Sequence, residues 1–156
     1  MQETVVILDN IRSTHNVGSI FRTGDAAGVS KVYLCGYTPA PIDRFGREQK
    51  DIAKTALGAE TAVAWEQGST AEVIAQLRAD GFTICAVEQD AQSVSLYDYK
   101  RPQKLALIFG NEVDGVSQEA LEASDTILEI PMHGEKESLN VSVSVGVALF
   151  VLARPV

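Results

Sequence analysis

Short apolar runs and polar segments follow one another in a regular order along the whole chain. Six runs of four to six residues, rich in β-branched side chains, are continuously apolar, as strands buried on both faces are. They predict strands at Val5–Leu8, Lys31–Cys35, Ala62–Trp65, Phe82–Val87, Leu105–Phe109 and Thr126–Ile130. Helix-like segments lie between them. This order predicts an α/β fold with a mostly parallel sheet flanked by helices.

Capping residues mark the ends of the helix-like segments. Ser69-Thr-Ala-Glu72 is a capping box, Ser117 suits an N-cap, and Gly28 suits the left-handed position after a helix. These features predict helices at His15–Ala27, Ser69–Asp80 and Ser117–Ala123.

The last apolar segment supports two interpretations. Asn140–Val145 alternates with period two, which by itself is typical of a strand. The apolar run continues to Ala153, however, and Val141, Val145, Ala148, Leu149 and Leu152 share one helical face. We therefore expect a helix from about Asn140 to Ala153, in which the small residues Ser142 and Gly146 let another backbone approach.

Composition limits the class of protein. With 156 residues, 46% of them hydrophobic and 22% charged, the chain is expected to form one domain with a real core. The polar N-terminal residues and the lack of an apolar run of ~20 residues lead us to expect neither a signal peptide nor a membrane span. Cys35 and Cys85 lie inside apolar runs, which indicates two buried thiols in a reducing, cytoplasmic compartment. With only His15 and His133 besides, no zinc-binding spacing exists, and no metal is expected.

The net charge of −8 is unfavourable for binding a nucleic acid, but it is unevenly distributed. Residues 1–60 hold seven basic and seven acidic side chains, so the whole deficit lies in residues 61–156. In the neutral part, four basic residues would line one face if their segment were helical: Arg44, Arg47, Lys50 and Lys54. Together with Arg12 they are candidates for RNA contacts. A solvated face neutralised by acidic neighbours explains them equally well.

Three polar segments interrupt the pattern, each where a predicted strand ends. They are Asn10–Arg22, Leu105–Gly115 and Ile130–Ser142. Each alone has a structural explanation: a helix capped by Asn16, a tight acidic turn, and a loop with Ser138 as a cap. Neither a P-loop nor a dinucleotide-binding glycine pattern is present. All three together, in a small α/β domain, predict a ligand site beyond the carboxyl ends of the strands.

These segments resemble the three motifs of the SpoU branch of the SPOUT methyltransferases, a family of tRNA/rRNA 2′-O-methyltransferases. The first motif resembles Asn10–Val29, the second Leu107–Ser117, and the third Ile130–Ser142. Lys54–Ala59 is similar to a stretch that such proteins carry between the first two. The matching residues are Asn16, Arg22, Gly110, Glu112, Gly115, Pro131, Met132, Ser138, Leu139 and Asn140.

The resemblance implies a fold, a methyl donor and an assembly. The C-terminal segment would form a deep trefoil knot, and S-adenosylmethionine would bind in the knot loops. Its binding residues would be Val87, Gly110, Ile130, Met132, Ser138 and Leu139. The protein would be a homodimer whose active sites are each completed by the partner, with the C-terminal helix at the interface.

The resemblance also assigns catalysis to Arg22, supported by Asn16, Glu112, Ser138 and Asn140. A guanidinium is normally never deprotonated, so we expect Arg22 to hold the neighbouring phosphate and to stabilise the developing alkoxide. Base catalysis by Arg22 stays open.

The substrate is expected to be tRNA, with rRNA nearly as well supported, and a helper protein could assist recognition. Two other interpretations stay open. One is a non-catalytic knotted dimer that binds RNA or nucleotide, and the other is methylation of a base nitrogen or of an acceptor other than RNA.

Overall fold

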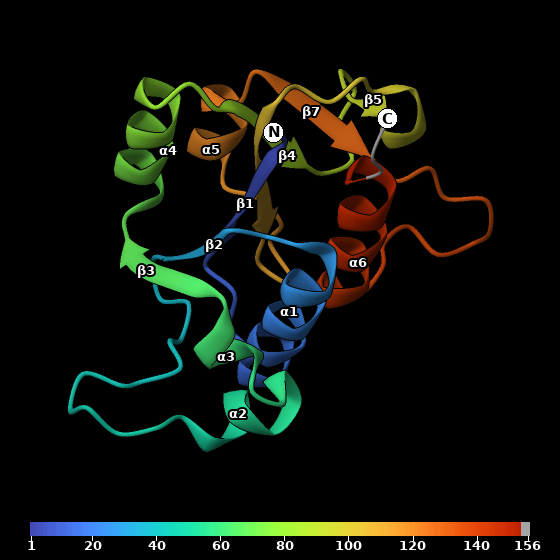
Figure 1. The fold of residues 1–156 in the computed structure, drawn as a ribbon. Helices are drawn as coiled ribbons and strands as arrows, with labels where there is room; N and C mark the ends of the chain where they lie inside the picture. The colour runs from blue at the N-terminus through green and yellow to red at the C-terminus, as the bar shows by residue number, and fades with distance from the viewer. Residues whose placement is uncertain (154–156) are drawn as a thin grey trace.

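The computed structural model describes residues 1–153, which form one seven-stranded sheet in the order β3-β2-β1-β6-β4-β7-β5 (Figure 1). All six pairings between neighbouring strands are parallel. The strands are β1 (Glu3–Asp9), β2 (Lys31–Cys35), β3 (Ala64–Gly68), β4 (Thr83–Val87), β5 (Val94–Ser95), β6 (Lys104–Gly110) and β7 (Thr126–Glu129). The predicted α/β class with a parallel sheet is confirmed.

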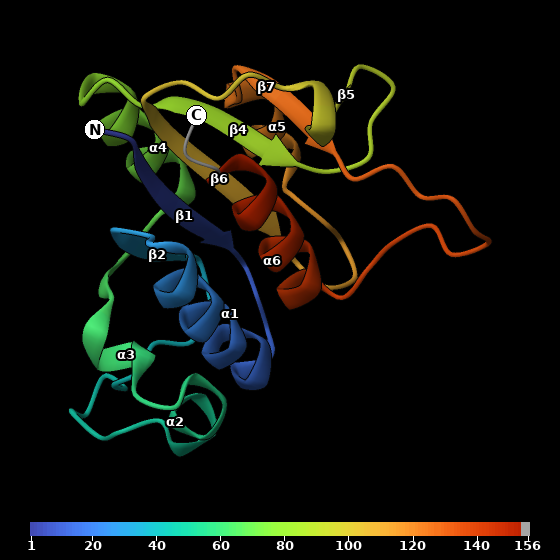
Figure 2. The ribbon, with the colours of Figure 1, turned by 45° about the vertical axis from the view of Figure 1, so that its right-hand side comes forward.

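Helices cover both faces of this sheet. They are α1 (Thr14–Ala27), α2 (Lys50–Ala56), α3 (Ala59–Ala62), α4 (Thr70–Ala79), α5 (Gln118–Ala123) and α6 (Val141–Leu152), with a 3₁₀ turn, η1, at Leu96–Asp98. Figure 2 shows α1 and α6 side by side on one face, with α2 and α3 below them and α4 and α5 behind the sheet. Each face has its own apolar core.

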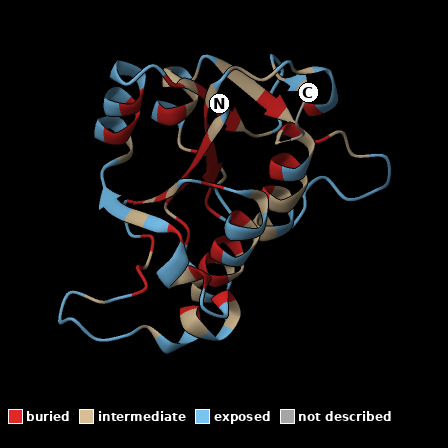
Figure 3. Ribbon diagram, in the orientation of Figure 1, coloured by how far each residue is buried: buried red, intermediate tan, exposed pale blue. Residues whose placement is uncertain are grey.

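The central strands β1 and β6 are buried almost throughout, as the red ribbon in Figure 3 shows. Their continuously apolar sequences predicted this. The thiols of Cys35 and Cys85 are free and buried, as expected, and desolvation raises the pKa of each to about 11. Both thiols therefore stay protonated at neutral pH and are poor nucleophiles.

The third predicted strand was wrong in position and in burial. Ala62 ends the short helix α3, and β3 begins two residues later than expected. Because β3 is an edge strand that pairs only with β2, most of its residues are exposed. The two-residue strand β5 was not predicted, since so short a segment carries no periodicity.

The C-terminal segment is a helix, which excludes the strand that its alternation suggests. Asn140 caps α6 and accepts a hydrogen bond from the main-chain N–H of Ser142 at 2.9 Å. The knotted threading of this segment stays a prediction. None of the helices within residues 1–153 is long and apolar enough to cross a membrane.

Helix α1 packs closely on α2 at Gly18. A Cβ atom at Gly18 would lie 2.4 Å from the carbonyl oxygen of Ile52, too close for a real contact. We expect Gly18→Ala to lower the free energy of unfolding by about 1–3 kcal/mol, because the two helices must move apart. Chemical denaturation measures this.

Gly24→Ala, in the same helix, is the matched control. A Cβ atom there would meet only Val29, at 3.5 Å, an ordinary contact. Alanine has the higher helix propensity, so Gly24→Ala should be neutral or stabilising by up to about 1 kcal/mol. Equal losses in both variants would contradict the packing argument.

Candidate active site

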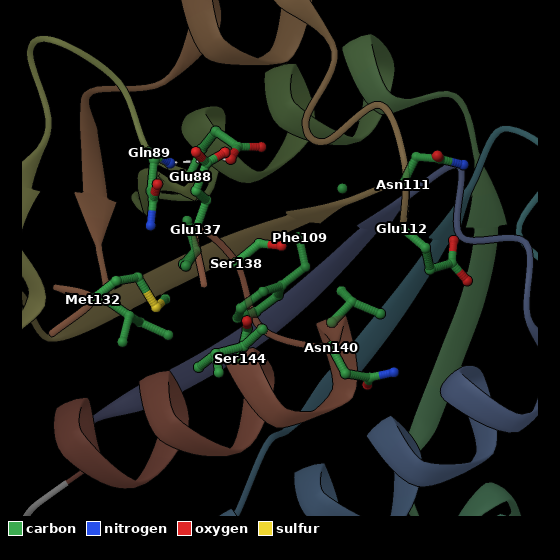
Figure 4. A pocket seen from close by; sticks show the side chains of 15 residues that line it. Glu88, Gln89, Phe109, Asn111, Glu112, Met132, Glu137, Ser138, Asn140 and Ser144 are labelled. Carbon is green, nitrogen blue, oxygen red and sulfur yellow. Dashed lines mark hydrogen bonds between the residues drawn. The ribbon is translucent and has the colours of Figure 1, made fainter. Parts of the chain in front are cut away.

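The carboxyl ends of β4, β6 and β7 face the N-terminal turn of α6 across a cleft of about 360 Å³ (Figure 4). Cavities of this size typically hold small molecules or cofactors. The cleft is lined by Val87, Glu88, Gln89, Phe109, Gly110, Asn111, Glu112, Ile130, Met132, Glu137, Ser138, Leu139, Asn140, Val141 and Ser144.

All six residues predicted to bind S-adenosylmethionine line this cleft, and so do three of the five predicted catalytic residues. The six are Val87, Gly110, Ile130, Met132, Ser138 and Leu139, and the three are Glu112, Ser138 and Asn140. The second and third motifs therefore meet in space, although twelve residues separate them along the chain. The segment after β4 completes the cleft with Glu88 and Gln89, which the sequence analysis did not select. Their position directly after a buried strand is the feature of the sequence that could have indicated them as lining residues.

Polar groups lie at both ends of the cleft. Figure 4 places Glu88, Gln89 and Glu137 at one end, and Asn111, Glu112 and Asn140 toward the other. Phe109 of β6 lies between them, and Met132 of the loop after β7 lies at the end that holds Gln89 and Glu137. This arrangement suits an elongated ligand with a flat apolar part and several polar groups.

Glu112 joins the loop after β6 to the start of α1. Its carboxylate accepts hydrogen bonds from the main-chain N–H groups of Arg12 and Ser13, at 2.9 and 2.8 Å, and from the side-chain amide of Asn16 at 3.1 Å. Desolvation raises the pKa of this carboxyl, but the hydrogen bonds outweigh it and the pKa is lowered. Glu112 therefore holds the first and second motifs together.

This carboxylate should contribute to the pH dependence of stability. Because its pKa is lowered on folding, its contribution is present above the unfolded pKa of about 4.3 and is lost as pH falls through the folded value. We expect Glu112→Gln to lower the free energy of unfolding by about 1 kcal/mol at pH 7, and by less at pH 3. Denaturation at both pH values measures the difference. Glu135→Gln, at an exposed carboxylate in the loop before α6, is the control for removal of a surface carboxylate and should change stability little at either pH. An equal loss by Glu112→Gln at both pH values would contradict this role.

The N-cap of α1 differs from the prediction. Ser13 caps the helix, and its hydroxyl accepts a hydrogen bond from the main-chain N–H of Asn16 at 3.1 Å. Asn16 lies one turn inside the helix, where its side chain is free to reach Glu112. Ser138 likewise is not the cap of α6, since Asn140 takes that position.

Gly110 is required by the loop that follows it. A Cβ atom at Gly110 would lie 2.1 Å from the main-chain nitrogen of Val116. The same nitrogen donates to the carboxylate of Glu88 at 3.0 Å, so strand β4 and the loop after β6 are fixed to each other. Asn111, also buried, donates from its side-chain amide to the hydroxyl of Tyr37 at 2.8 Å.

Arg22 lies apart from the cleft of its own chain. It is exposed on α1, two turns beyond Asn16, and it is not among the residues that line the cleft. The structure thus brings together the second and third motifs directly and Asn16 through Glu112, but it does not bring Arg22 to the same place.

The basic residues do not form one helical face. Arg44 and Arg47 lie in the loop between β2 and α2, and the helix begins only at Lys50. The condition for a shared face, a helical segment, is not met, because Gly46 adopts a positive φ of 77° and Asp43 closes a turn with Arg47. Lys50 and Lys54 are exposed on α2, and Arg12 is exposed before α1. Within residues 1–153, no cluster of three or more His, Cys, Asp or Glu side chains could hold a metal ion.

Comparison with known proteins agrees with this geometry. The family model of the SpoU rRNA methylase family matches residues 3–150. The chain is 35% identical over 146 residues to the 23S rRNA (guanosine-2′-O-)-methyltransferase RlmB of Neisseria meningitidis, a match that covers 93% of this chain and 56% of the relative.

Two solved structures share the fold. The AdoMet-bound rRNA methyltransferase of Sinorhizobium meliloti superposes with a TM-score of 0.87 at 31% identity, over 96% of this chain and 55% of that chain. A structure described as giving insights into the 2-OH methylation of C/U34 on tRNA superposes with a TM-score of 0.79 at 26% identity, over 96% of this chain and 93% of that one. The chain spans a little over half the length of the curated relatives that it matches. From the family match, the shared fold and the position of the three motifs, the chain belongs to the SpoU rRNA methylase family.

Proposed function

We propose that this chain is an S-adenosylmethionine-dependent methyltransferase that acts on a ribose 2′-hydroxyl of RNA, with residues 1–156 as one methyltransferase domain. The observation that carries the proposal is the cleft between β4, β6, β7 and α6, where the second and third motifs meet. Family membership supports it, and so do the relatives named as RNA 2′-O-methyltransferases.

The residues of the cleft fit such a methyl donor. Val87, Ile130, Met132 and Leu139 offer an apolar surface for a flat base, and the acidic and amide side chains at the two ends suit hydroxyl and amino groups. When bound, S-adenosylmethionine supplies a methyl group on a positively charged sulfur. Glu112 is occupied by three hydrogen bonds from its own chain, so its role is to position α1 and the loop after β6.

A second copy of the chain would complete the site. Arg22 is exposed and outside the cleft of its own chain, so an Arg22 that acts on the substrate there would come from a partner. Helix α6 packs on α1 and also exposes Val143 and Phe150, which suits an interface that includes both helices. A homodimer with composite active sites accounts for the exposure of Arg22, for its position outside the cleft and for the exposed apolar side chains of α6.

The chemistry follows from the acceptor. A ribose hydroxyl is a poor nucleophile, so transfer requires alignment with the methyl group and loss of the hydroxyl proton. The guanidinium of Arg22 would hold the adjacent phosphate and stabilise the negative charge that develops on the 2′-oxygen. Proton abstraction by Arg22 itself is the alternative.

We further propose that the substrate is rRNA, with tRNA as the second candidate. The curated relatives are named for 23S rRNA, and they favour rRNA over the tRNA that the sequence analysis placed first. tRNA is the second candidate because the structure concerned with C/U34 of tRNA matches over nearly all of both chains. A helper protein remains part of the proposal for either RNA, given the net charge of −8.

Two measurements test the proposal. Calorimetric titration with S-adenosylmethionine should show one binding site per chain, and labelled methyl should pass to unmodified 23S rRNA or to a pool of unmodified tRNA. Mass spectrometry of the digested RNA should find the methyl group on ribose. Absence of binding would contradict the enzyme, binding without transfer to any RNA would favour a non-catalytic dimer, and methyl on a base nitrogen would contradict the acceptor.

A further inference from the structure

The tip of the loop between β2 and α2 carries an exposed aromatic ring with two guanidinium groups close to it. Phe45 is 65% exposed, although phenylalanine is normally buried. The guanidinium carbons of Arg44 and Arg47 lie 4.8 and 4.9 Å from the centre of its ring. Figure 1 shows this loop standing out from the body of the molecule, beside α2.

The tip of this loop is held in a defined conformation. One oxygen of the Asp43 carboxylate accepts the main-chain N–H groups of Phe45 and Arg47, at 2.8 and 2.9 Å, and the other accepts from the guanidinium of Arg47 at 3.0 Å. The main-chain N–H of Asp43 donates to the carbonyl of Arg47, and Ile42 and Glu48 form an antiparallel bridge. A hairpin closed by these hydrogen bonds therefore holds the ring in solvent, and the exposure of the ring follows from the conformation of the loop.

The segment that forms this tip and α2 is slightly basic, whereas the chain as a whole carries −8. Residues 43–54 hold four basic side chains, Arg44, Arg47, Lys50 and Lys54, and three acidic ones, Asp43, Glu48 and Asp51. Asp43 is already engaged by Arg47, which leaves Arg44 free of any ion pair among the described residues. Exposed guanidinium groups beside an exposed ring are a combination that binds single-stranded nucleic acid, since bases stack on aromatic and guanidinium planes while cations contact phosphates.

We propose that Phe45, with Arg44 and Arg47, forms a stacking site for an unpaired base of the RNA substrate, outside the cleft. This proposal rests on the proposed action on RNA. It adds that the recognised nucleotide lies in a loop or an unpaired end, because a base inside a duplex cannot reach an aromatic side chain. The tip lies at the same edge of the parallel sheet as the cleft, but it does not line it, so it governs RNA binding and not the chemical step.

Binding of labelled RNA measured by fluorescence anisotropy tests the site. The probes are a single-stranded 12-mer and a duplex of the same sequence. Because Phe45→Ala removes one base stack, we expect it to weaken binding of the single strand by roughly 5- to 100-fold. Binding of the duplex should change little. Phe45→Tyr should restore the affinity, and Phe45→Leu should not. Arg44→Gln should instead reduce the slope of log affinity against log salt by about 1.

Tyr97→Ala is the matched control, since Tyr97 is another aromatic residue that is 60% exposed, on η1, which follows β5 at the opposite end of the strand order from β2 and β3. It should leave both affinities unchanged. In the methyl-transfer assay, Phe45→Ala should raise KM for RNA and leave kcat unaltered.

Three results would contradict the stacking site without contradicting the proposed function. The first is a Phe45→Ala protein that binds the single strand within twofold of the wild type, and the second is an equal loss of affinity for the single strand and the duplex. The third is a wild-type protein that does not prefer the single strand. The last result is also expected if the tip docks a protein partner. Failure of the proposed function is distinct, because it would appear as an absence of methyl transfer by the wild-type protein.

Discussion

Replacing Arg22 with alanine is expected to slow methyl transfer by about 100-fold or more, within the range that positioned proton transfer and charge stabilisation supply. Binding of S-adenosylmethionine should stay within about twofold of wild type, because Arg22 does not line the cleft of its own chain. The fold should be unaffected, since Arg22 is exposed. Single-turnover transfer to RNA, together with calorimetric titration of the methyl donor, measures both quantities.

Arg22→Lys separates charge from geometry. Lysine keeps the positive charge but lacks the planar fork that binds phosphate through two hydrogen bonds, so partial recovery is expected. Near-normal turnover by Arg22→Ala would remove the assigned role.

A mixed dimer tests whether the site is composite. One chain would carry Arg22→Ala with an intact cleft, and the other would carry Gly110→Ala with an intact arginine. At a concentration of S-adenosylmethionine well below the Kd of Gly110→Ala, each variant alone should transfer methyl much more slowly than the wild type. The mixed dimer contains one complete site and should recover part of the activity. Native mass spectrometry confirms that mixed dimers form. Mixed dimers without activity would contradict the composite site.

Replacing Gly110 with alanine is expected to lower the free energy of unfolding by about 1–3 kcal/mol and to weaken binding of S-adenosylmethionine more than about tenfold. The added Cβ atom would lie 2.1 Å from the nitrogen of Val116, so the loop must shift. That shift breaks the hydrogen bond between Val116 and Glu88, and Glu88 lines the cleft. Thermal unfolding and calorimetric titration measure the two effects.

Gly134→Ala is the matched control for this change. Gly134 lies in the loop before α6, and no atom lies within 4 Å of the position its Cβ would take. Stability and binding of the methyl donor should both match the wild type. A Gly110→Ala protein that binds the methyl donor normally would show that the loop after β6 does not shape the cleft.

Most of the fold could be predicted from the sequence because its strands are buried on both faces. β1, β2, β4, β6 and β7 are continuous apolar runs, and their predicted positions agree with the structure to within about two residues. β3 could not be placed in the same way, because an edge strand needs apolar residues on neither face. Its position depends on pairing with β2, which is a tertiary interaction.

The site was predictable as a set of segments but not as a geometry. Strand ends followed by glycine and polar residues indicated Gly110, Glu112 and the stretch from Ile130 to Asn140. The cleft is lined by Gly110 and Glu112 and by part of that stretch, namely Ile130, Met132 and residues 137–140. The roles of individual residues could not be predicted in the same way. A carboxylate has the same appearance in a sequence whether it faces a ligand or accepts main-chain N–H groups, and Glu112 does the latter.

The basic segment shows a further limit of periodicity. The spacing of Arg44, Arg47, Lys50 and Lys54 suits a helix, but the side chain of Asp43 and the left-handed Gly46 stabilise a turn. Hydrogen bonds from a side chain to its neighbouring main chain compete with helix formation, and hydrophobic spacing does not report them.

The position of β6 has a consequence for synthesis of the chain. β1 pairs with β2 on one side and with β6 on the other, and its partner residues on β6 lie about one hundred positions later in the sequence. While the ribosome makes the first hundred residues, β1 has an unpaired edge and its apolar side chains lack half of their cover. Parallel sheets with such distant partners fold slowly, and their open edges favour aggregation. The nascent chain is therefore most vulnerable just before residues 104–110 emerge, and a chaperone that covers β1 in that interval would protect it.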